Sequence, residues 1–202
     1  MTEPTDIALL DQWRNGDAEA GQALFQRHFD SIYGFFETKC EADADELVQA
    51  TFLACLRARD QFRKESSFRT YLFTIARHEL YRKLSERRRD LGRIDFEVSS
   101  IAELAATPRT RIAAREDRAR LLAALRELSV EQQILLELHY WEGLDMAALG
   151  EIFECPAVTI RSRLYRARNA LREVMLREPS LAAAVGETQE SFDAWAKSLA
   201  LQ

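Results

Sequence analysis

The sequence predicts an all-α protein with two small helical domains joined by a linker, the C-terminal one a helix-turn-helix. Its 202 residues include only seven glycines and four prolines, too few turn-formers for a sandwich or barrel of many short strands. Hydrophobic residues make up 47% of the chain and charged residues 30%, which is typical of a folded protein. Apolar residues recur at helical spacing in both halves.

Several classes of protein are excluded by simpler features. No apolar run approaches the roughly 18 residues that a membrane-spanning helix needs, and the start MTEPTDIALLDQW has no basic stretch followed by an apolar one. Cys40, Cys55 and Cys155 form no C-x-x-C pair, which argues against a disulfide framework or a zinc site. We therefore expect a cytoplasmic protein with no membrane insertion, no metal and no cofactor.

Positive charge is concentrated in two blocks of an acidic chain whose net charge is −5. Residues 57–93 carry 12 basic and 5 acidic side chains, and residues 156–177 carry 6 and 1. Two compact basic blocks indicate two separate contacts with a polyanion. The alternative is that they are two solvated helix faces.

Breaks in the helical pattern divide the chain. We expect helical domains at 6–92 and 113–177, a linker at 93–112 and a tail at 178–202. In the tail, Phe192, Trp195 and Leu199 share one helical face. This segment would either pack back on the second domain or shield a basic DNA-binding face, and the sequence leaves its role open.

The first domain holds two informative helices. Asp43 and Glu46 have the spacing of a capping box and predict a helix over about 44–60. Its buried stripe comprises Leu47, Val48, Thr51, Phe52, Cys55 and Leu56. Ser67 can cap a second helix that runs to about Arg89 and is rich in arginine, with aromatic residues between. Rings among cations suit single-stranded nucleic acid, although Tyr71 and Phe73 could equally belong to the core.

The second domain has the pattern of a helix-turn-helix. Ser129 and Gln132 form a capping-box spacing that opens a helix to about Glu142, and Asp145 can cap a short helix after it. A tight turn at 154–156 leads into a long helix with one apolar seam: Ile160, Leu164, Ala167, Leu171 and Met175. The opposite face is polar and basic, as in a reader of the major groove. An ordinary helical hairpin is the alternative.

Two long stretches resemble the sigma-70 family of bacterial transcription initiation factors, in its extracytoplasmic-function (ECF) group. DADELVQATFLACLRARDQFRKESSFRTYLFTIARHELYRKLSERRR is similar to the second sigma region. LRELSVEQQILLELHYWEGLDMAALGEIFECPAVTIRSRLYRARNALRE is similar to the fourth. They cover residues 43–89 and 125–173, in the family's order and at its spacing.

The resemblance implies a subunit that binds core RNA polymerase and promoter DNA and directs promoter recognition and melting. The residues implied at the polymerase clamp are Asp45, Glu46, Gln49 and Phe52. Those implied at the −10 element and its melting are Lys64, Glu65, Ser66, Ser67, Arg77, His78, Tyr81 and Arg82. Those implied at the −35 element are Thr159, Arg161, Ser162, Arg163 and Arg166. An anti-sigma factor is a further candidate partner.

Some positions depart from the family pattern. Ala50 and Ala54 replace polar residues of the clamp helix, and His78 replaces an asparagine. Glu154 replaces the common glycine of the turn, where a left-handed backbone would cost of the order of 1 kcal/mol. The family's linker threads through the RNA path of the polymerase, which fits a loosely ordered 93–112.

Two other functions are alternatives to this one. An enzyme would need a nucleophile with a base or a metal cluster, yet His28, His78 and His139 lie in different predicted helices without such spacing, so no catalytic residue is expected. A stand-alone dimeric repressor would bind a palindromic duplex without polymerase. It would carry an apolar dimer face in its N-terminal half instead of an arginine-rich helix.

Overall fold

The computed structural model describes residues 3–87, 94–101, 116–177 and residue 194. Within these ranges the backbone is helical and forms no strand, with one isolated antiparallel bridge between Ser100 and Ser129. The all-α prediction is confirmed. The helices are α1 (Asp6–Arg14), α2 (Ala18–Cys40), η1 (Glu41–Asp43), α3 (Ala44–Ala58), η2 (Arg59–Gln61), α4 (Phe68–Arg87), α6 (Glu116–Glu127), α7 (Val130–Tyr140), α8 (Met146–Ile152) and α9 (Ala157–Leu176). Among them, none combines the length and hydropathy that crossing a bilayer requires.

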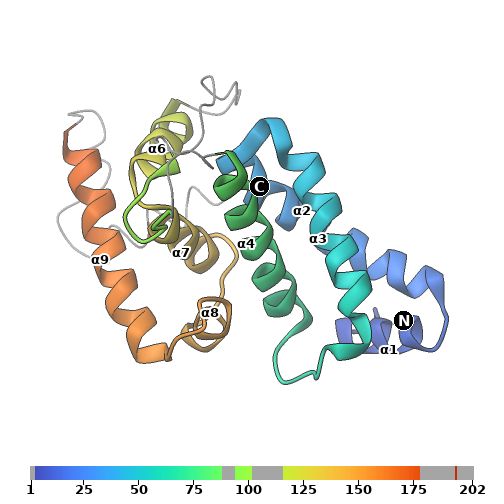
Figure 1. Cartoon of the computed structure of the whole chain (residues 1–202). Helices are drawn as coiled ribbons and strands as arrows, with labels where there is room; N and C mark the ends of the chain where they lie inside the picture. Colours follow the sequence, from blue (N-terminus) through green and yellow to red (C-terminus); the bar gives the residue numbers. More distant parts are fainter. Residues whose placement is uncertain (1–2, 88–93, 102–115, 178–193, 195–202) are drawn as a thin grey trace.

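The helices form two groups that lie against each other (Figure 1). We call α1–α4 the N-terminal unit and α6–α9 the C-terminal unit. In Figure 1 the N-terminal unit, blue to green, lies on the right, and the C-terminal unit, yellow to orange, lies on the left. Helix α4 faces α7 and α8 across the boundary, and α4 and α8 are in contact. The position of α4 therefore determines which of its side chains stay exposed.

Helices α1 and α2 form a tight antiparallel pair because a glycine lets an indole approach the backbone. Asp17 caps α2 by accepting hydrogen bonds from the amides of Glu19 (3.0 Å) and Ala20 (3.1 Å). The Trp13 side chain then lies directly over Gly21, where a Cβ would come within 2.6 Å of Trp13 Cδ1. This contact buries Trp13 and fixes α1 on α2.

Helix α3 begins where the sequence predicted, but its cap is not the predicted capping box. Asp43 occupies the N-cap position and makes no side-chain cap hydrogen bond. Its carboxylate instead pairs with Lys83 (3.2 Å) and Arg87 of α4, and Glu46 pairs with Lys83 (2.8 Å). Cations on α4 thus outcompete the backbone amides for these carboxylates, and the ion pairs tie α3 to α4.

Helix α4 carries both a buried stripe and the arginine-rich face. Ser67 caps it, since its Oγ accepts a hydrogen bond from the Thr70 amide at 3.0 Å. Phe73 is 1% exposed and belongs to the core. Tyr71 is half-buried and stacks on Phe62 with ring centroids 4.6 Å apart. The rings near the start of α4 are therefore packing residues, while Arg88 and Arg89 lie outside the described residues.

The C-terminal unit follows its sequence pattern closely. Ser129 and Gln132 form the predicted capping box at α7, and Asp145 caps α8 by accepting from the Ala148 amide at 2.8 Å. The predicted apolar seam of α9 is buried in full: Ile160, Leu164, Ala167, Leu171 and Met175. This seam packs on α6, α7 and α8.

Part of the expected linker is packed instead of loose. The carbonyl of Ser99 accepts from the Val130 amide (2.9 Å), and that of Phe96 accepts from the Glu131 amide (3.1 Å). Ile101 is 1% exposed. The expectation of a loosely ordered 93–112 is therefore wrong for residues 94–101; its other residues, and the tail residues Phe192, Trp195 and Leu199, lie outside the described ranges.

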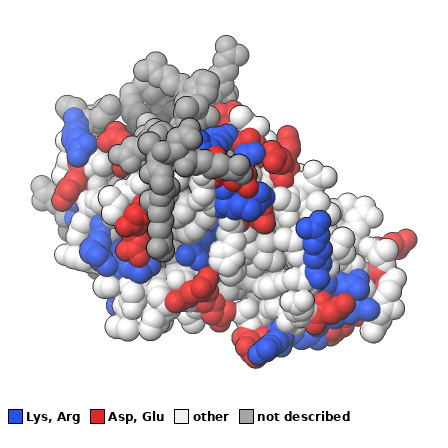
Figure 2. Space-filling view, in the orientation of Figure 1, with Lys and Arg blue, Asp and Glu red and all other residues white. Residues whose placement is uncertain are grey.

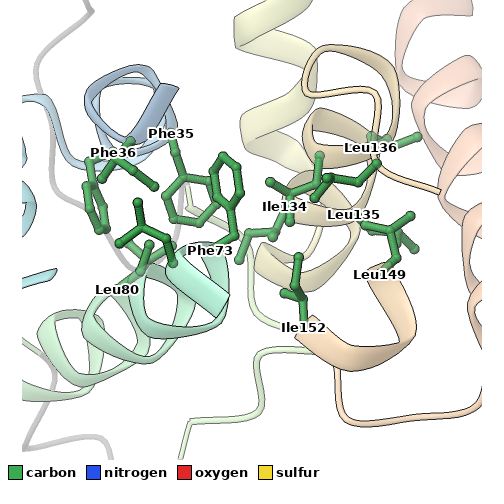
Figure 3. Packing of buried hydrophobic residues seen from close by; sticks show 14 of the residues in the cluster. Phe35, Phe36, Phe73, Leu80, Ile134, Leu135, Leu136, Leu149 and Ile152 are labelled. Atoms are coloured by element: carbon green, nitrogen blue, oxygen red, sulfur yellow. The ribbon is translucent and has the colours of Figure 1, made fainter. Parts of the chain in front are cut away.

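The two units share one hydrophobic core (Figure 3). The rings of Phe35 from α2 and Phe73 from α4 meet edge to face, 5.8 Å apart. Figure 3 shows them next to Ile134 of α7, and it shows Leu149 and Ile152 of α8 in the same cluster. Because apolar burial contributes about 25 cal/mol per Å², this shared core favours the packed arrangement of the two units.

A buried ion pair crosses the same boundary. The Lys39 ammonium is fully buried and donates to the Phe35 carbonyl (2.8 Å), to Thr38 Oγ1 (3.1 Å) and to the Glu137 carboxylate. Glu137 also accepts from Gln133 Nε2 at 2.7 Å. Burial lowers the pKa of Lys39, and the Glu137 charge opposes that change. The pair joins α2 to α7 across 98 positions of sequence.

We expect Gly21→Ala to destabilise the fold by about 1–3 kcal/mol, because the new methyl overlaps the Trp13 ring. Gly34→Ala is the matched control on the same helix, since a Cβ at Gly34 has no neighbour within 4 Å. Alanine there should raise stability by up to about 1 kcal/mol through helix propensity. Urea unfolding measures both, and equal effects of the two substitutions would contradict the close Trp13 contact.

We expect Lys39→Met to cost about 3–5 kcal/mol, because it leaves the Glu137 carboxylate buried without its counter-charge. The double variant Lys39→Met/Glu137→Met should recover most of that loss, since two apolar side chains replace the pair. The free energy of unfolding in urea measures each. A double variant that is no more stable than Lys39→Met would show that the two charges are not coupled.

Candidate nucleic-acid interface

Helices α8 and α9 and the turn between them form a helix-turn-helix. The turn is tight, since a Cβ at Gly150 would lie 2.8 Å from the Cys155 carbonyl oxygen. Glu154 has a left-handed backbone with φ of 54°, a conformation that favours glycine. The strain expected at Glu154 is present, and the motif forms despite it.

The predicted −35 residues on the outward face of α9 differ in how exposed they are. Arg161, Ser162 and Arg166 are exposed, whereas Thr159 is half-buried. Ser162 Oγ donates to the Thr159 carbonyl at 2.9 Å, which leaves the Ser162 oxygen free to accept. Tyr165, 58% exposed, lies beside them. This face has the donors needed to read base edges in a major groove.

Arg163 differs from its neighbours because two carboxylates hold it. Its Nη1 donates to Glu131 at 3.0 Å and its Nη2 to Glu97 at 3.0 Å. Partial burial raises the pKa of Glu131, and the Arg163 charge opposes that shift. In this conformation Arg163 joins α9 to α7 and to the segment 94–101, and it is not free to contact DNA.

The predicted melting residues of α4 meet the C-terminal unit. Arg77 Nη1 donates to the Ile152 carbonyl at the end of α8 (2.7 Å), and its guanidinium lies 5.1 Å from the Phe153 ring centroid. His78 Nε2 lies 3.1 Å from Glu154 Oε1. These residues are therefore brought together with the turn of the helix-turn-helix, which the sequence did not predict.

Tyr81 and Arg82 also have partners within the chain. Tyr81 stacks on Phe96, with ring centroids 4.1 Å apart and planes 11° from parallel. Burial raises the pKa of the Tyr81 phenol. Arg82 pairs with Glu79 and Glu86 on its own helix, on an exposed surface where such pairs contribute little. Tyr81 is therefore covered, while Arg82 stays accessible.

The loop before α4 is anchored by α1. Arg14 donates to the carbonyls of Arg59 (3.1 Å) and Phe62 (2.7 Å). Lys64 has a positive φ of 60° and pairs with Asp11. Of the other predicted residues, Glu65 and Ser67 are exposed and Ser66 is half-buried. Sequence reasoning missed Asp11 and Arg14, since 45 or more positions separate Arg14 from the carbonyls that it binds.

The acidic face of α3 borders an apolar groove. Asp45, Glu46 and Gln49 are exposed as predicted, and Phe52 is half-buried. The groove between α2 and α3 has a volume of about 270 Å³ and is lined by Phe25, Phe29, Asp45, Val48, Gln49, Phe52, Leu53 and Leu56. Leu56 is 45% exposed, so its assignment to the buried stripe was wrong. It lines the groove beside Leu53, which is 42% exposed.

On the face drawn in Figure 2, positive charge is not gathered into one continuous surface. Figure 2 shows Lys and Arg interspersed with Asp and Glu on the face drawn there. Many cations of the first basic block have acidic partners, such as Lys83 with Asp43 and Arg69 with Glu142. In the described ranges, no group of three or more His, Cys, Asp or Glu could hold a metal ion, and all three cysteines are free.

Family comparison assigns both units. Residues 24–90 match the model of Sigma-70 region 2, and residues 118–171 match that of Sigma-70, region 4. The chain belongs to the sigma-70 family. It is an RNA polymerase sigma factor of the ECF group, and the repressor alternative is not favoured.

Individual relatives agree with this assignment. The ECF RNA polymerase sigma-E factors of Haemophilus influenzae and Escherichia coli K12 are each 27% identical to this chain over 176 residues. Each match covers 83% of this chain, and it covers 93% of the Haemophilus influenzae protein and 92% of the Escherichia coli protein. The sigma factor RpoE of Bartonella quintana, solved with the anti-sigma factor NepR, is 26% identical with a TM-score of 0.59, over 76% of this chain and 96% of that one. CnrH, solved with the cytosolic domain of CnrY, has the same fold at 23% identity, with a TM-score of 0.65 over 87% of this chain and 99% of that one.

We expect Arg14→Ala to cost about 1–3 kcal/mol, because the loop carbonyls lose a charged donor. Arg14→Lys is the control that keeps the charge but not the forked donor geometry, and it should recover only part of the loss. Urea unfolding gives the stability, and amide exchange over 59–66 reports the loop. Unchanged exchange in Arg14→Ala would contradict the anchoring role.

Proposed function

We propose that this sigma factor joins core RNA polymerase in the cytoplasm and gives it promoter specificity, without catalysing a reaction itself. Residues 6–92 would bind core polymerase and the −10 element, 93–112 would be the linker, and 113–177 would bind the −35 element. The observation that carries the proposal is the presence of both sigma regions in order, with a polar and basic α9 face exposed next to a formed turn. An anti-sigma factor is a further candidate partner, because RpoE was solved with one.

The −35 element would be read by α9. Arg161, Ser162 and Arg166 are exposed and offer donors to base edges. Thr159 and Arg163 flank them, and Arg163 would first have to leave Glu97 and Glu131. Arginine is the commonest partner of guanine in the major groove because its two donors match O6 and N7.

The −10 element would be bound at two places, the loop before α4 and a stretch within α4. The loop Lys64, Glu65, Ser66 and Ser67 precedes the helix, and Arg77, His78, Tyr81 and Arg82 lie farther along it. Cations beside an aromatic ring can hold phosphates and stack an unpaired base. The cost of unstacking, a few kcal/mol per flipped base, would be offset by these contacts and by the polymerase.

Core polymerase would dock on the acidic face of α3. Asp45, Glu46, Gln49 and Phe52 are the predicted contacts. We add Phe29 and Leu53, which are 44% and 42% exposed on the adjoining groove. Exposed apolar side chains that lie together commonly mark a protein interface. An apolar groove rimmed by carboxylates suits a partner surface that combines apolar and basic side chains.

Run-off transcription of restriction-cut genomic DNA, with core polymerase and with or without this chain, tests the proposed function. We expect discrete transcripts only when both proteins are present, and the start sites would identify promoters for later work. Equal transcripts without the chain, or tight palindrome-specific binding by the free chain, would overturn the proposal.

Once such a promoter is known, Arg166→Ala should weaken its use by about 1–3 kcal/mol and relax the preference at one −35 position. Arg177→Ala is the matched control, since it removes the same charge from the residue that follows α9, where Arg177 pairs with Glu127. Transcription from −35 variants measures both. A uniform loss across all variants would assign Arg166 to a phosphate, and an unchanged preference would show that it reads no base.

A further inference from the structure

The first turn of α9 exposes an apolar side chain beside the residues proposed to read the −35 element. Val158 is 69% exposed, and Tyr165, two turns farther along α9, is 58% exposed. At about 100° per residue, Val158 lies within about 60° of Arg161, Ser162 and Tyr165 around the helix axis. The face proposed to contact base edges therefore combines apolar groups with hydrogen-bond donors.

The position of Val158 is fixed by its neighbours in the chain. The amides of Thr159 and Ile160 both donate to the Pro156 carbonyl, at 2.8 and 3.2 Å, so the first turn of α9 is formed. Ile160 is fully buried and anchors this turn in the C-terminal unit. A valine in a helix has one strongly preferred rotamer, so its two methyl groups are held in a defined direction before any ligand binds.

The fold does not require a valine at this position. The Val158 side chain lies outside the hydrophobic core, and valine is a weaker helix former than alanine. Single exposed apolar residues are common on protein surfaces. This one, however, is on the N-terminal turn of the second helix of a helix-turn-helix, which is the part that meets base edges in the major groove.

The major groove offers one apolar group that suits such a side chain. Thymine presents its C5-methyl group there, whereas guanine and adenine present the acceptors that arginine and serine side chains recognise. Arg161, Ser162 and Arg166 supply those polar contacts on the same face. The role that they leave open, contact with a thymine methyl, is the one that Val158 can fill.

We propose that Val158 is a specificity-determining residue of this sigma factor, which selects a thymine in the −35 element by contact with its C5-methyl group. The assignment rests on the proposed function, because it takes α9 to be the −35 reader. The contact removes one methyl group from water, which corresponds to an about three- to fivefold preference for thymine at one position.

Selection from a pool of random duplexes tests the assignment without a known promoter. The full chain with core polymerase binds the pool, the bound DNA is sequenced, and transcript start sites distinguish the −35 element from the −10 element. One pool is amplified with dTTP and another with dUTP, which keeps base pairing but removes the C5-methyl of every thymine. Leu176→Ala is the matched control for Val158→Ala, since Leu176 is an exposed apolar residue at the other end of α9.

We expect the wild-type chain to select thymine about three- to fivefold over other bases at one −35 position in the dTTP pool, and to lose that preference in the dUTP pool. Val158→Ala should lose the same preference in the dTTP pool and keep the preferences at the other positions. Val158→Ile, which keeps a β-branched apolar side chain, and Leu176→Ala should both retain it. Thermal melting should show Val158→Ala to be at least as stable as the wild-type chain.

The remaining outcomes separate this assignment from the proposed function. A −35 motif that is the same in both pools, or a methyl-dependent position that Val158→Ala leaves unchanged, would overturn the assignment and leave the proposed function intact. A uniform loss at all positions in Val158→Ala would also overturn it, since it would indicate a contact with the DNA backbone. If no motif were enriched and no transcript were made, the proposed function would fall, and the assignment with it.

Discussion

The contact between α4 and the end of α8 is the constraint on which the rest of the arrangement depends. One guanidinium, that of Arg77, meets the last carbonyl of α8 and lies against Phe153 and Tyr81. A cation at a helix C-terminus is favourable because it opposes the negative end of the backbone dipole. The same boundary also holds the apolar core shared by α2, α4, α7 and α8, and the buried Lys39–Glu137 pair, which joins α2 to α7.

This arrangement resolves an apparent conflict in the charge pattern. The chain has two basic blocks suited to DNA, yet Figure 2 shows Lys and Arg mixed with Asp and Glu on the face drawn there. Much of that neutralisation comes from residues distant in sequence, such as Glu142 with Arg69 and Glu97 with Arg163. The same side chains can therefore serve two states, one in which the units neutralise each other and one in which the polymerase and DNA take their place. A net charge of −5 also disfavours contact between the free chain and polyanions such as bulk DNA.

Much of the fold was predictable because it depends on interactions between residues close in sequence. The caps at Ser67, Ser129 and Asp145 and the seam of α9 depend on neighbours within a few residues, and the structure confirms them. The Asp43 capping box failed because Lys83 and Arg87, some forty residues away, compete for the same carboxylate. The apposition of α4 with α8 has no local signature. The exception is Glu154, whose departure from glycine was visible in the sequence, although its partners on α4 were not.

The distance between the two units is the most direct measure of the closed arrangement. Spin labels at Gln26→Cys on α2 and Ala123→Cys on α6, both at exposed positions, would report it in a Cys155→Ser chain by double electron–electron resonance. Cys40 and Cys55 are buried, and burial raises both pKa values, that of Cys55 to about 12, so they should stay unlabelled. We predict one short distance in the free chain and a longer one in the complex with core polymerase. The same short distance in a transcriptionally active complex would contradict this account.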